Sequence, residues 1–195
     1  MTRTAMIPIV APRSTKLAST INRDQARLTQ WDAVIIGAGP AGSITAFCLS
    51  NAGFSTLLLD RVGLPRAKVC GCCLGPWGVH VLGQLGLGSV LDDAGLIDAV
   101  QWRVQDRQCM IPSQGFRVLD RRGLDTRLAR AARDAGAALL WDASARVNHA
   151  NAVELHGAGN RTMLSARAII VADGLGGSSL RDHPAFTQRI HSKSL

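Results

Sequence analysis

The feature that most constrains the fold of this chain is an uncharged stretch between Asp32 and Asp60. The stretch is long enough to span a bilayer, so a membrane helix is the first alternative to consider. Its β-branched run, residues 34–36, stops at Gly37. Pro40 and two further glycines follow at once, which a lipid-exposed helix would not accommodate in one turn. The pattern predicts a strand, a loop, a helix and a second strand, and no transmembrane segment.

The loop after the first strand, GAGPAG at residues 37–42, is a G-x-G-x-x-G pattern in the place where its chemistry requires it. The first glycine allows a tight turn, the second lets the backbone approach a diphosphate, and the third removes a side chain where helix and strand pack. The free N–H groups and the positive end of the helix dipole then attract the phosphates. The residues predicted to bind a dinucleotide here are Gly37, Gly39, Pro40, Ala41 and Gly42.

Asp60 ends the second predicted strand, close to the spacing of about 20 residues at which a carboxylate accepts hydrogen bonds from an adenosine ribose. An Asp at a strand end also serves as a simple turn cap, and this alternative stays open. The complete unit of strand, loop, helix, strand and acid indicates an adenine dinucleotide. It does not by itself choose between NAD and FAD.

The net charge of +8 comes from basic residues that are scattered along the chain rather than gathered in a block. With no tyrosine and few aromatic residues for base stacking, this pattern is typical of solvated helix faces, and we expect no nucleic-acid partner. No secretory signal precedes the five cysteines, which indicates reduced thiols and a cytoplasmic location. Cys70, Cys72 and Cys73 offer sulfur ligands without an obvious fourth, so no metal site is expected.

Three later segments carry a family resemblance. Residues 61–76, RVGLPRAKVCGCCLGP, resemble the PR-x-K-x-CGG-x-L-x-P segment of geranylgeranyl reductase-like flavoproteins, which belong to a wider group with FAD-dependent monooxygenases and flavin-dependent halogenases. Residues 121–137 are similar to the R-x-x-x-D-x-x-L-x-x-x-A-x-x-x-GA segment of this family, and residues 171–181 to its GADG-x-x-S-x-x-R fingerprint. The order of these motifs favours FAD over NAD.

The resemblance implies an α/β fold, the Rossmann-like FAD-binding fold of the glutathione reductase type, with three layers and a β-meander. It implies an FAD-binding domain over residues 31–186, with residues 97–118 as a fragment of the substrate-binding sheet. We expect residues 1–30 to be a disordered leader, with an organellar presequence as the alternative, and residues 187–195 to be a polar tail. Relatives are longer, so we also expect a truncated domain with a strand missing beside the first one.

The same resemblance implies further cofactor-binding residues and leaves the catalytic residues unknown. The loop after Asp60 approaches the flavin in relatives, and the Asp-Gly pair lies near the diphosphate and ribitol. By position, these residues are Arg61, Arg66, Lys68, Cys70, Gly71, Arg121, Asp173 and Gly174. Asp173 also ends an apolar run at the carboxyl edge of the sheet, where open α/β sheets bind ligands, and a simple turn role before Gly174 is the alternative. The chain departs from the family at Cys72, which replaces the second glycine after the loop cysteine.

These observations leave competing functions. The first is an FAD-dependent oxidoreductase that uses hydride transfer or oxygen activation on an isoprenoid or aromatic small molecule, with NAD(P)H as the candidate electron donor. The second is a non-catalytic FAD-binding module, either a gene fragment or one half of a split flavoprotein with a separate C-terminal half. A third, an NAD-binding Rossmann domain, accounts for the first motif alone.

Overall fold

The computed structural model describes residues 15–70, 72–149, 152–156, 161–181, 183 and 185–186. These residues form two compact units. The sheet unit contains Lys16–Leu64 and the described residues from Leu128 onward, and the hairpin unit contains Pro65–Arg127. Gly71 and residues 187–195, which carry two of the sequence-based predictions, lie outside the described residues.

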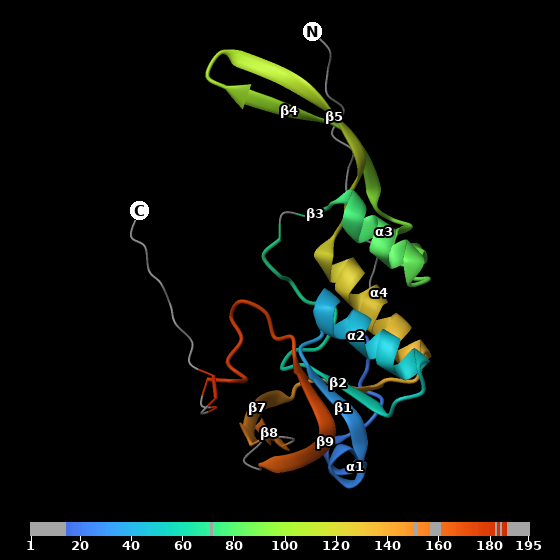
Figure 1. Cartoon of the computed structure of the whole chain (residues 1–195), viewed down its shortest axis with the longest axis vertical. Helices are drawn as coiled ribbons and strands as arrows, with labels where there is room; N and C mark the ends of the chain where they lie inside the picture. The colour runs from blue at the N-terminus through green and yellow to red at the C-terminus, as the bar shows by residue number, and fades with distance from the viewer. Residues whose placement is uncertain are drawn as a thin grey trace. The chain divides into compact units, whose positions relative to one another are not determined.

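The order of helices and strands agrees with an α/β chain (Figure 1). The elements are α1 (Arg23–Leu28), β1 (Trp31–Ile36), α2 (Pro40–Asn51), β2 (Thr56–Leu59), β3 (Cys73–Leu74), α3 (Pro76–Gln84), the 3-10 helix η1 (Gly88–Leu91), β4 (Gly95–Val104), β5 (Arg107–Val118), α4 (Arg121–Asp134), β6 (Ala138–Leu140), β7 (Ser144–His149), β8 (Ala152–His156) and β9 (Thr162–Val171).

The sheet unit is built on one sheet with the strand order β6-β2-β1-β9-β8-β7. The first four strands in this order are parallel, and Ile35 of β1 pairs with Leu58 of β2 on one side and Ile170 of β9 on the other. The expected gap beside the first strand is therefore wrong. It fails because β9 is one continuous strand, whose first half pairs with β8 and whose second half pairs with β1.

Alternation along the strands divides the core of the sheet unit into two layers of contacts. Ile35, Leu58 and Leu139 point to one face, where they pack with Ala46 of α2 and Ala132 of α4. The neighbouring residues of the same strands point to the other face, where apolar residues of the β7–β9 meander cover them. Because both faces are buried, the parallel strands are continuously apolar. The predicted three-layer, Rossmann-like arrangement with a meander is confirmed.

The expectation of a disordered leader is wrong for residues 15–30. Leu17 is buried and forms a β-bridge with Leu64, and the hydroxyl of Thr20 accepts a hydrogen bond from the amide of Leu139 at 2.8 Å. Asn22 begins α1 with a capping box, and Ala26 is fully buried. This segment packs on the sheet because its sparse apolar residues fall on one side, a pattern too weak to detect in an otherwise polar sequence.

The hairpin unit contains a long antiparallel ribbon, β4 and β5, with β3 paired at its base. The ribbon extends the short β excursion expected over residues 97–118, and whether it belongs to a substrate-binding sheet stays a prediction. On one face Trp102 lies opposite Cys109 and Val100 lies opposite Ile111, whereas Gln101 and Gln108 hydrogen-bond across the other face at 2.9 Å. No helix among the described residues is long and apolar enough to cross a membrane.

Candidate functional site

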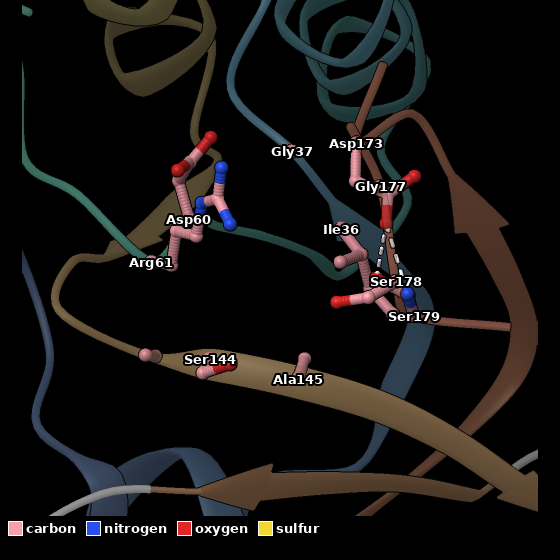
Figure 2. Close-up of a pocket in the computed structure, with 11 residues that line it drawn as sticks. Ile36, Gly37, Asp60, Arg61, Ser144, Ala145, Asp173, Gly177, Ser178 and Ser179 are labelled. Carbon is pink, nitrogen blue, oxygen red and sulfur yellow. Dashed lines mark hydrogen bonds between the residues drawn. The ribbon is translucent and has the colours of Figure 1, made fainter. Parts of the chain in front are cut away.

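The candidate site lies at the carboxyl edge of the parallel strands, where a pocket opens within the sheet unit. Ile36 ends β1 and Gly37 follows it, Asp60 follows β2, and the segment after β9 contributes Asp173 and Ser179. Figure 2 shows Asp60 on one side of Gly37 and Asp173 on the other, with the start of β7 forming a further wall. Open α/β sheets bind ligands at this edge, beside the point where the strand order reverses.

Two of the loop glycines are required by the protein itself. Gly37 has a φ of +110°, and a β-carbon there would overlap the carbonyl oxygen of Ala172 after β9. A β-carbon on Gly42 would overlap the carbonyl oxygen of Gly37 and lie 3.3 Å from Cγ2 of Ile35. These contacts hold the first turn of α2 tightly against β1 and β9. They agree with the tight turn predicted for Gly37 and with the packing role predicted for Gly42.

Gly39 differs from both, because no protein atom requires it to be glycine. Its φ of −83° is open to any residue, and a β-carbon there would meet no atom within 4 Å. Gly39 is the N-cap of α2, where no side chain accepts the amides of the first turn and no acidic residue lies in that turn. The helix end is positively polarised, and an anion has room to approach its backbone amides closely. A diphosphate fits such a position.

Asp60 ties the end of β2 to the glycine-rich loop. Its carboxylate accepts a hydrogen bond from the Ala38 amide at 2.7 Å and another from the Val62 amide at 3.2 Å. The residue is only 6% exposed, although it lines the pocket. Asp60 therefore holds the loop in place, and its contact with a ribose stays a prediction.

Asp173 organises the segment that follows β9. Its Oδ2 accepts hydrogen bonds from the Ser179 amide at 3.0 Å and the Ser179 hydroxyl at 2.6 Å, which Figure 2 marks as dashed lines. A β-carbon on Gly177 would overlap the Asp173 carboxylate, and Gly174 has a φ of +78°. The carboxylate thus acts as the centre of a turn at the pocket rim. Its contact with a cofactor remains a prediction.

The remaining predicted residues divide between the two units. Arg61 lines the pocket of the sheet unit. Arg66, Lys68, Cys70 and Arg121 belong to the hairpin unit, and Gly71 lies outside the described residues. The structure thus groups Gly37, Gly39, Asp60, Arg61 and Asp173 with the glycine loop, and it groups Cys70 with Arg121 separately.

Within the hairpin unit, Cys70 and Arg121 contact one another. The Cys72 amide donates to the Cys70 sulfur at 3.3 Å, and this bond together with the Arg121 guanidinium lowers the pKa of the Cys70 thiol. Arg121 in turn donates to both carboxylate oxygens of Asp125, at 2.8 and 3.2 Å, and this pairing raises the pKa of Arg121. Asp125 is fully buried, so it fixes the guanidinium beside the thiol.

Among the pocket residues that the sequence analysis did not predict, two organise the Asp173 turn. Ser179 is the partner of Asp173, and Gly177 provides the space that the Asp173 carboxylate fills. The run Gly176-Gly177-Ser178-Ser179 reads as an ordinary loop, and the family fingerprint draws attention to Ser178 rather than Ser179. A fold-back hydrogen bond of this kind leaves no periodic signal in a sequence.

Comparison with known families accounts for this combination of an open helix end and two acids at one sheet edge. Residues 30–193 match a family described as FAD binding domain. The chain belongs to this family. The FAD-binding domain therefore includes the glycine loop, Asp60 and the Asp173 turn, and the predicted resemblance to FAD-dependent flavoproteins is confirmed.

Several relatives of known name share this FAD-binding domain. A menaquinone reductase of Mycobacterium tuberculosis is 37% identical over 159 residues, covering 73% of this chain and 37% of the relative. A digeranylgeranylglycerophospholipid reductase of Methanopyrus kandleri is 30% identical over 157 residues, covering 75% of this chain and 38% of the relative. The structure of a myxobacterial chondrochloren halogenase, a variant of FAD-dependent halogenases, matches with 26% identity and a TM-score of 0.66 over 74% of this chain and 37% of that one.

The matched region is only part of each relative. The chain spans less than two-fifths of the length of the two curated relatives described above. The FAD-binding domain is shared with them, whereas the activity of the whole relatives is a matter of proposal for this chain.

Proposed function

We propose that this chain binds FAD at the carboxyl edge of the sheet unit, and that it serves an FAD-dependent oxidoreductase as its cofactor-binding part. The observation that carries the proposal is Gly39. This glycine sits at an uncapped helix end, and the space beside it is filled by no protein atom. The space beside this helix end is therefore open to a bound group, and a diphosphate is a group that such a position accepts.

The other residues of the site have separate roles in this proposal. The backbone amides at the start of α2 hold the diphosphate, and Asp60 accepts hydrogen bonds from the adenosine ribose while it keeps its bond to the Ala38 amide. The Asp173 turn presents backbone groups around Gly174 to the cofactor, and Arg61 offers a charge to the phosphates. FAD supplies hydride transfer or oxygen activation, and the protein supplies position and electrostatics.

The favoured substrate is a small molecule with an isoprenoid chain. Two relatives are named as reductases of menaquinone and of digeranylgeranylglycerophospholipid, and the second name itself specifies isoprenoid chains. The ribbon of the hairpin unit exposes an apolar face that includes Trp102 and Ile111, which suits such a ligand. NAD(P)H is the proposed electron donor. The alternative is an aromatic substrate, which the likeness to a halogenase favours.

A second candidate function is an FAD-binding module that does not turn over alone. The coverage of the relatives favours it, because this chain matches less than two-fifths of the length of each of the two described above. In this case a separate protein or segment would supply the rest of the enzyme.

Titration of the purified chain with FAD and with NAD tests cofactor binding. We expect quenching of flavin fluorescence with saturable binding, and no competition by NAD at equal concentration. Mass spectrometry of any cofactor that copurifies with the chain provides an independent measurement. A chain that stays colourless and binds NAD in calorimetry would contradict the proposal.

A further inference from the structure

The loop that leads into β3 carries an unusual group of thiols. Cys70, Cys72 and Cys73 lie within four consecutive residues. Cys70 and Cys73 are exposed, and Cys72 is partly buried. The Cys72 amide donates to the Cys70 sulfur at 3.3 Å, and the Cys72 sulfur lies 3.7 Å from the Cys70 carbonyl oxygen. Each of the two cysteines therefore contacts the other's backbone. Cys72 also adopts a left-handed φ of +54°, a conformation that a non-glycine residue rarely takes.

A fixed positive charge lies against this pair. Arg121, at the start of α4, hydrogen-bonds the Cys70 sulfur, and Asp125 one turn later holds the guanidinium with two bonds. The Cys72 amide and then the Arg121 guanidinium lower the pKa of Cys70, and they outweigh the opposing effects of burial and of the Asp125 charge. A thiolate that is exposed and held by a cation is the reactive form of cysteine.

We propose that Cys70 and Cys72 form a redox-active dithiol that exchanges with low-molecular-weight disulfides such as glutathione disulfide. The Cys70 thiolate attacks one sulfur of the disulfide, forming a Cys70–glutathione bond and releasing glutathione thiolate. Cys72 then loses its proton to solvent and attacks the Cys70 sulfur, forming the Cys70–Cys72 disulfide and releasing a second glutathione. Two protein thiols are oxidised and one glutathione disulfide is reduced. Exposed disulfides with short loops are labile, which suits a reversible modification.

The first test compares alkylation rates of cysteines within the same chain. The reduced protein is treated with iodoacetamide at neutral pH, and labelling of each cysteine is followed by peptide mass spectrometry. We expect Cys70 to react about tenfold faster than Cys109, an exposed cysteine of β5. The alkylation rate of Cys70 should also reach half of its maximum at a lower pH than the alkylation rate of Cys109. Equal rates at the two cysteines would overturn the proposal.

Arg121 provides matched variants for this test. Arg121→Gln should bring the Cys70 rate to within about twofold of Cys109, whereas Arg121→Lys should retain most of it because the charge remains. Arg122→Gln, which changes the neighbouring exposed arginine that pairs with Asp120, should have no effect. If Arg121→Gln unfolds the chain by leaving Asp125 unpaired, the double variant Arg121→Gln with Asp125→Asn removes the charge without leaving a buried carboxylate unpaired. A Cys70 rate that stays about tenfold above that of Cys109 in this variant would overturn the role of the charge.

The second test identifies the disulfide. After incubation with glutathione disulfide, the wild-type chain should lose two hydrogen atoms, and proteolysis should locate the bond between Cys70 and Cys72. Cys72→Ser should instead keep glutathione on Cys70, and Cys73→Ser should behave as the wild type does. A stable mixed disulfide in the wild type, or a bond from Cys70 to Cys73, would overturn the assignment of Cys72 as the partner.

Discussion

At the scale of single residues, the glycines of the loop separate the demands of folding from those of binding. Gly37 has a positive φ and a carbonyl oxygen where its β-carbon would lie, so the fold requires it. Gly39 has neither, so a side chain there would cost the fold little and would matter mainly to a ligand. The same sequence motif thus contains residues whose substitution should have opposite consequences.

Gly39→Ala should weaken FAD binding at least tenfold while the fold stays intact, since the added methyl group enters the space for the diphosphate. The free energy of unfolding should fall by less than about 1 kcal/mol, because alanine is a poorer N-cap than glycine. Flavin fluorescence titration and urea denaturation measure the two effects. Gly83→Ala in α3, where a β-carbon also meets no atom, is the matched control and should leave FAD affinity unchanged.

Gly37→Ala provides the opposite comparison, and it should cost at least about 1–3 kcal/mol of stability from backbone strain alone. If Gly39→Ala proved as destabilising as Gly37→Ala, or if it bound FAD as tightly as the wild type, the assignment of Gly39 to the diphosphate would be wrong.

Asp60→Asn should lower both stability and affinity, because Asp60 has at least two hydrogen-bond partners within the protein. An asparagine accepts through one oxygen only, so it cannot accept from the Ala38 and Val62 amides through separate oxygens as Asp60 does. We expect a loss of about 1–3 kcal/mol in the free energy of unfolding of the apoprotein. FAD affinity should fall by about tenfold or more.

Asp142→Asn serves as the control for Asp60. Asp142 lies after β6, is exposed, and has a φ of +56° that asparagine accepts readily. An Asp60→Asn variant that loses stability but keeps the wild-type dissociation constant for FAD would assign Asp60 to the loop alone.

At the scale of elements, side-chain hydrogen bonds join the strands of the sheet unit in addition to the backbone hydrogen bonds between paired strands. Asp32 near the start of β1 accepts from the Ser55 amide at 3.0 Å and from Arg167 of β9 at 2.9 Å. It thereby links β1 to the segment before β2 and to the neighbouring strand. The Arg167 side chain is 79% exposed, so this link should weaken with added salt.

The pH dependence of stability should reveal the Asp32 link. The Ser55 amide and then Arg167 lower the pKa of Asp32 in the folded chain from its ordinary value of 3.8. The carboxylate therefore stabilises the fold above the unfolded-state pKa, and this contribution is lost as the pH falls through the lower folded-state pKa. Between about pH 5 and pH 3, urea midpoints of the wild type should fall more steeply than those of Asp32→Asn. Arg167→Gln should be intermediate, and parallel curves for all three chains would contradict the link.

The β4–β5 ribbon predicts self-association of the isolated chain. Trp102 and Val104 are 59% and 68% exposed, and they share one face of a two-stranded ribbon whose outer edges are largely unpaired. Trp102→Lys should reduce light scattering at high concentration and change the free energy of unfolding by less than about 0.5 kcal/mol. Gln101→Lys adds the same charge to the polar face and should not reduce scattering. Equal scattering in both variants would show that this face does not drive association.

At the scale of the whole molecule, the chain is an FAD-binding domain with a second unit built around the β4–β5 ribbon. We expect the 195-residue chain to bind FAD but to show no steady-state oxidation of NAD(P)H and no reduction of an isoprenoid alkene. Within the hairpin unit no described element covers the apolar face of the ribbon, so this unit offers a hydrophobic substrate a single wall that is open to water.

The rate of flavin-dependent NAD(P)H consumption by the monomeric chain measures its steady-state activity directly. Turnover at ordinary enzymatic rates by the chain alone would refute the non-catalytic reading and favour the oxidoreductase as a complete enzyme.

The sequence by itself determined the features that depend on local periodicity and on steric exclusion. It predicted the unit from β1 to Asp60 and the packing roles of Gly37 and Gly42, because a β-branched run, a glycine loop and an N-terminal proline restrict the backbone wherever they occur. It also predicted the α/β class and an FAD-binding family, which the comparisons confirm.

Only the tertiary structure decided which distant segments meet. It placed β9 beside β1, packed residues 16–30 on the sheet, turned Asp173 toward Ser179, and brought Arg121 to Cys70. These contacts join residues that no helical or strand period relates, and their stability comes from burial and hydrogen bonds that exist only once the chain is folded. A sequence records the residues that make such contacts, but the pairing depends on the arrangement of the sheet as a whole.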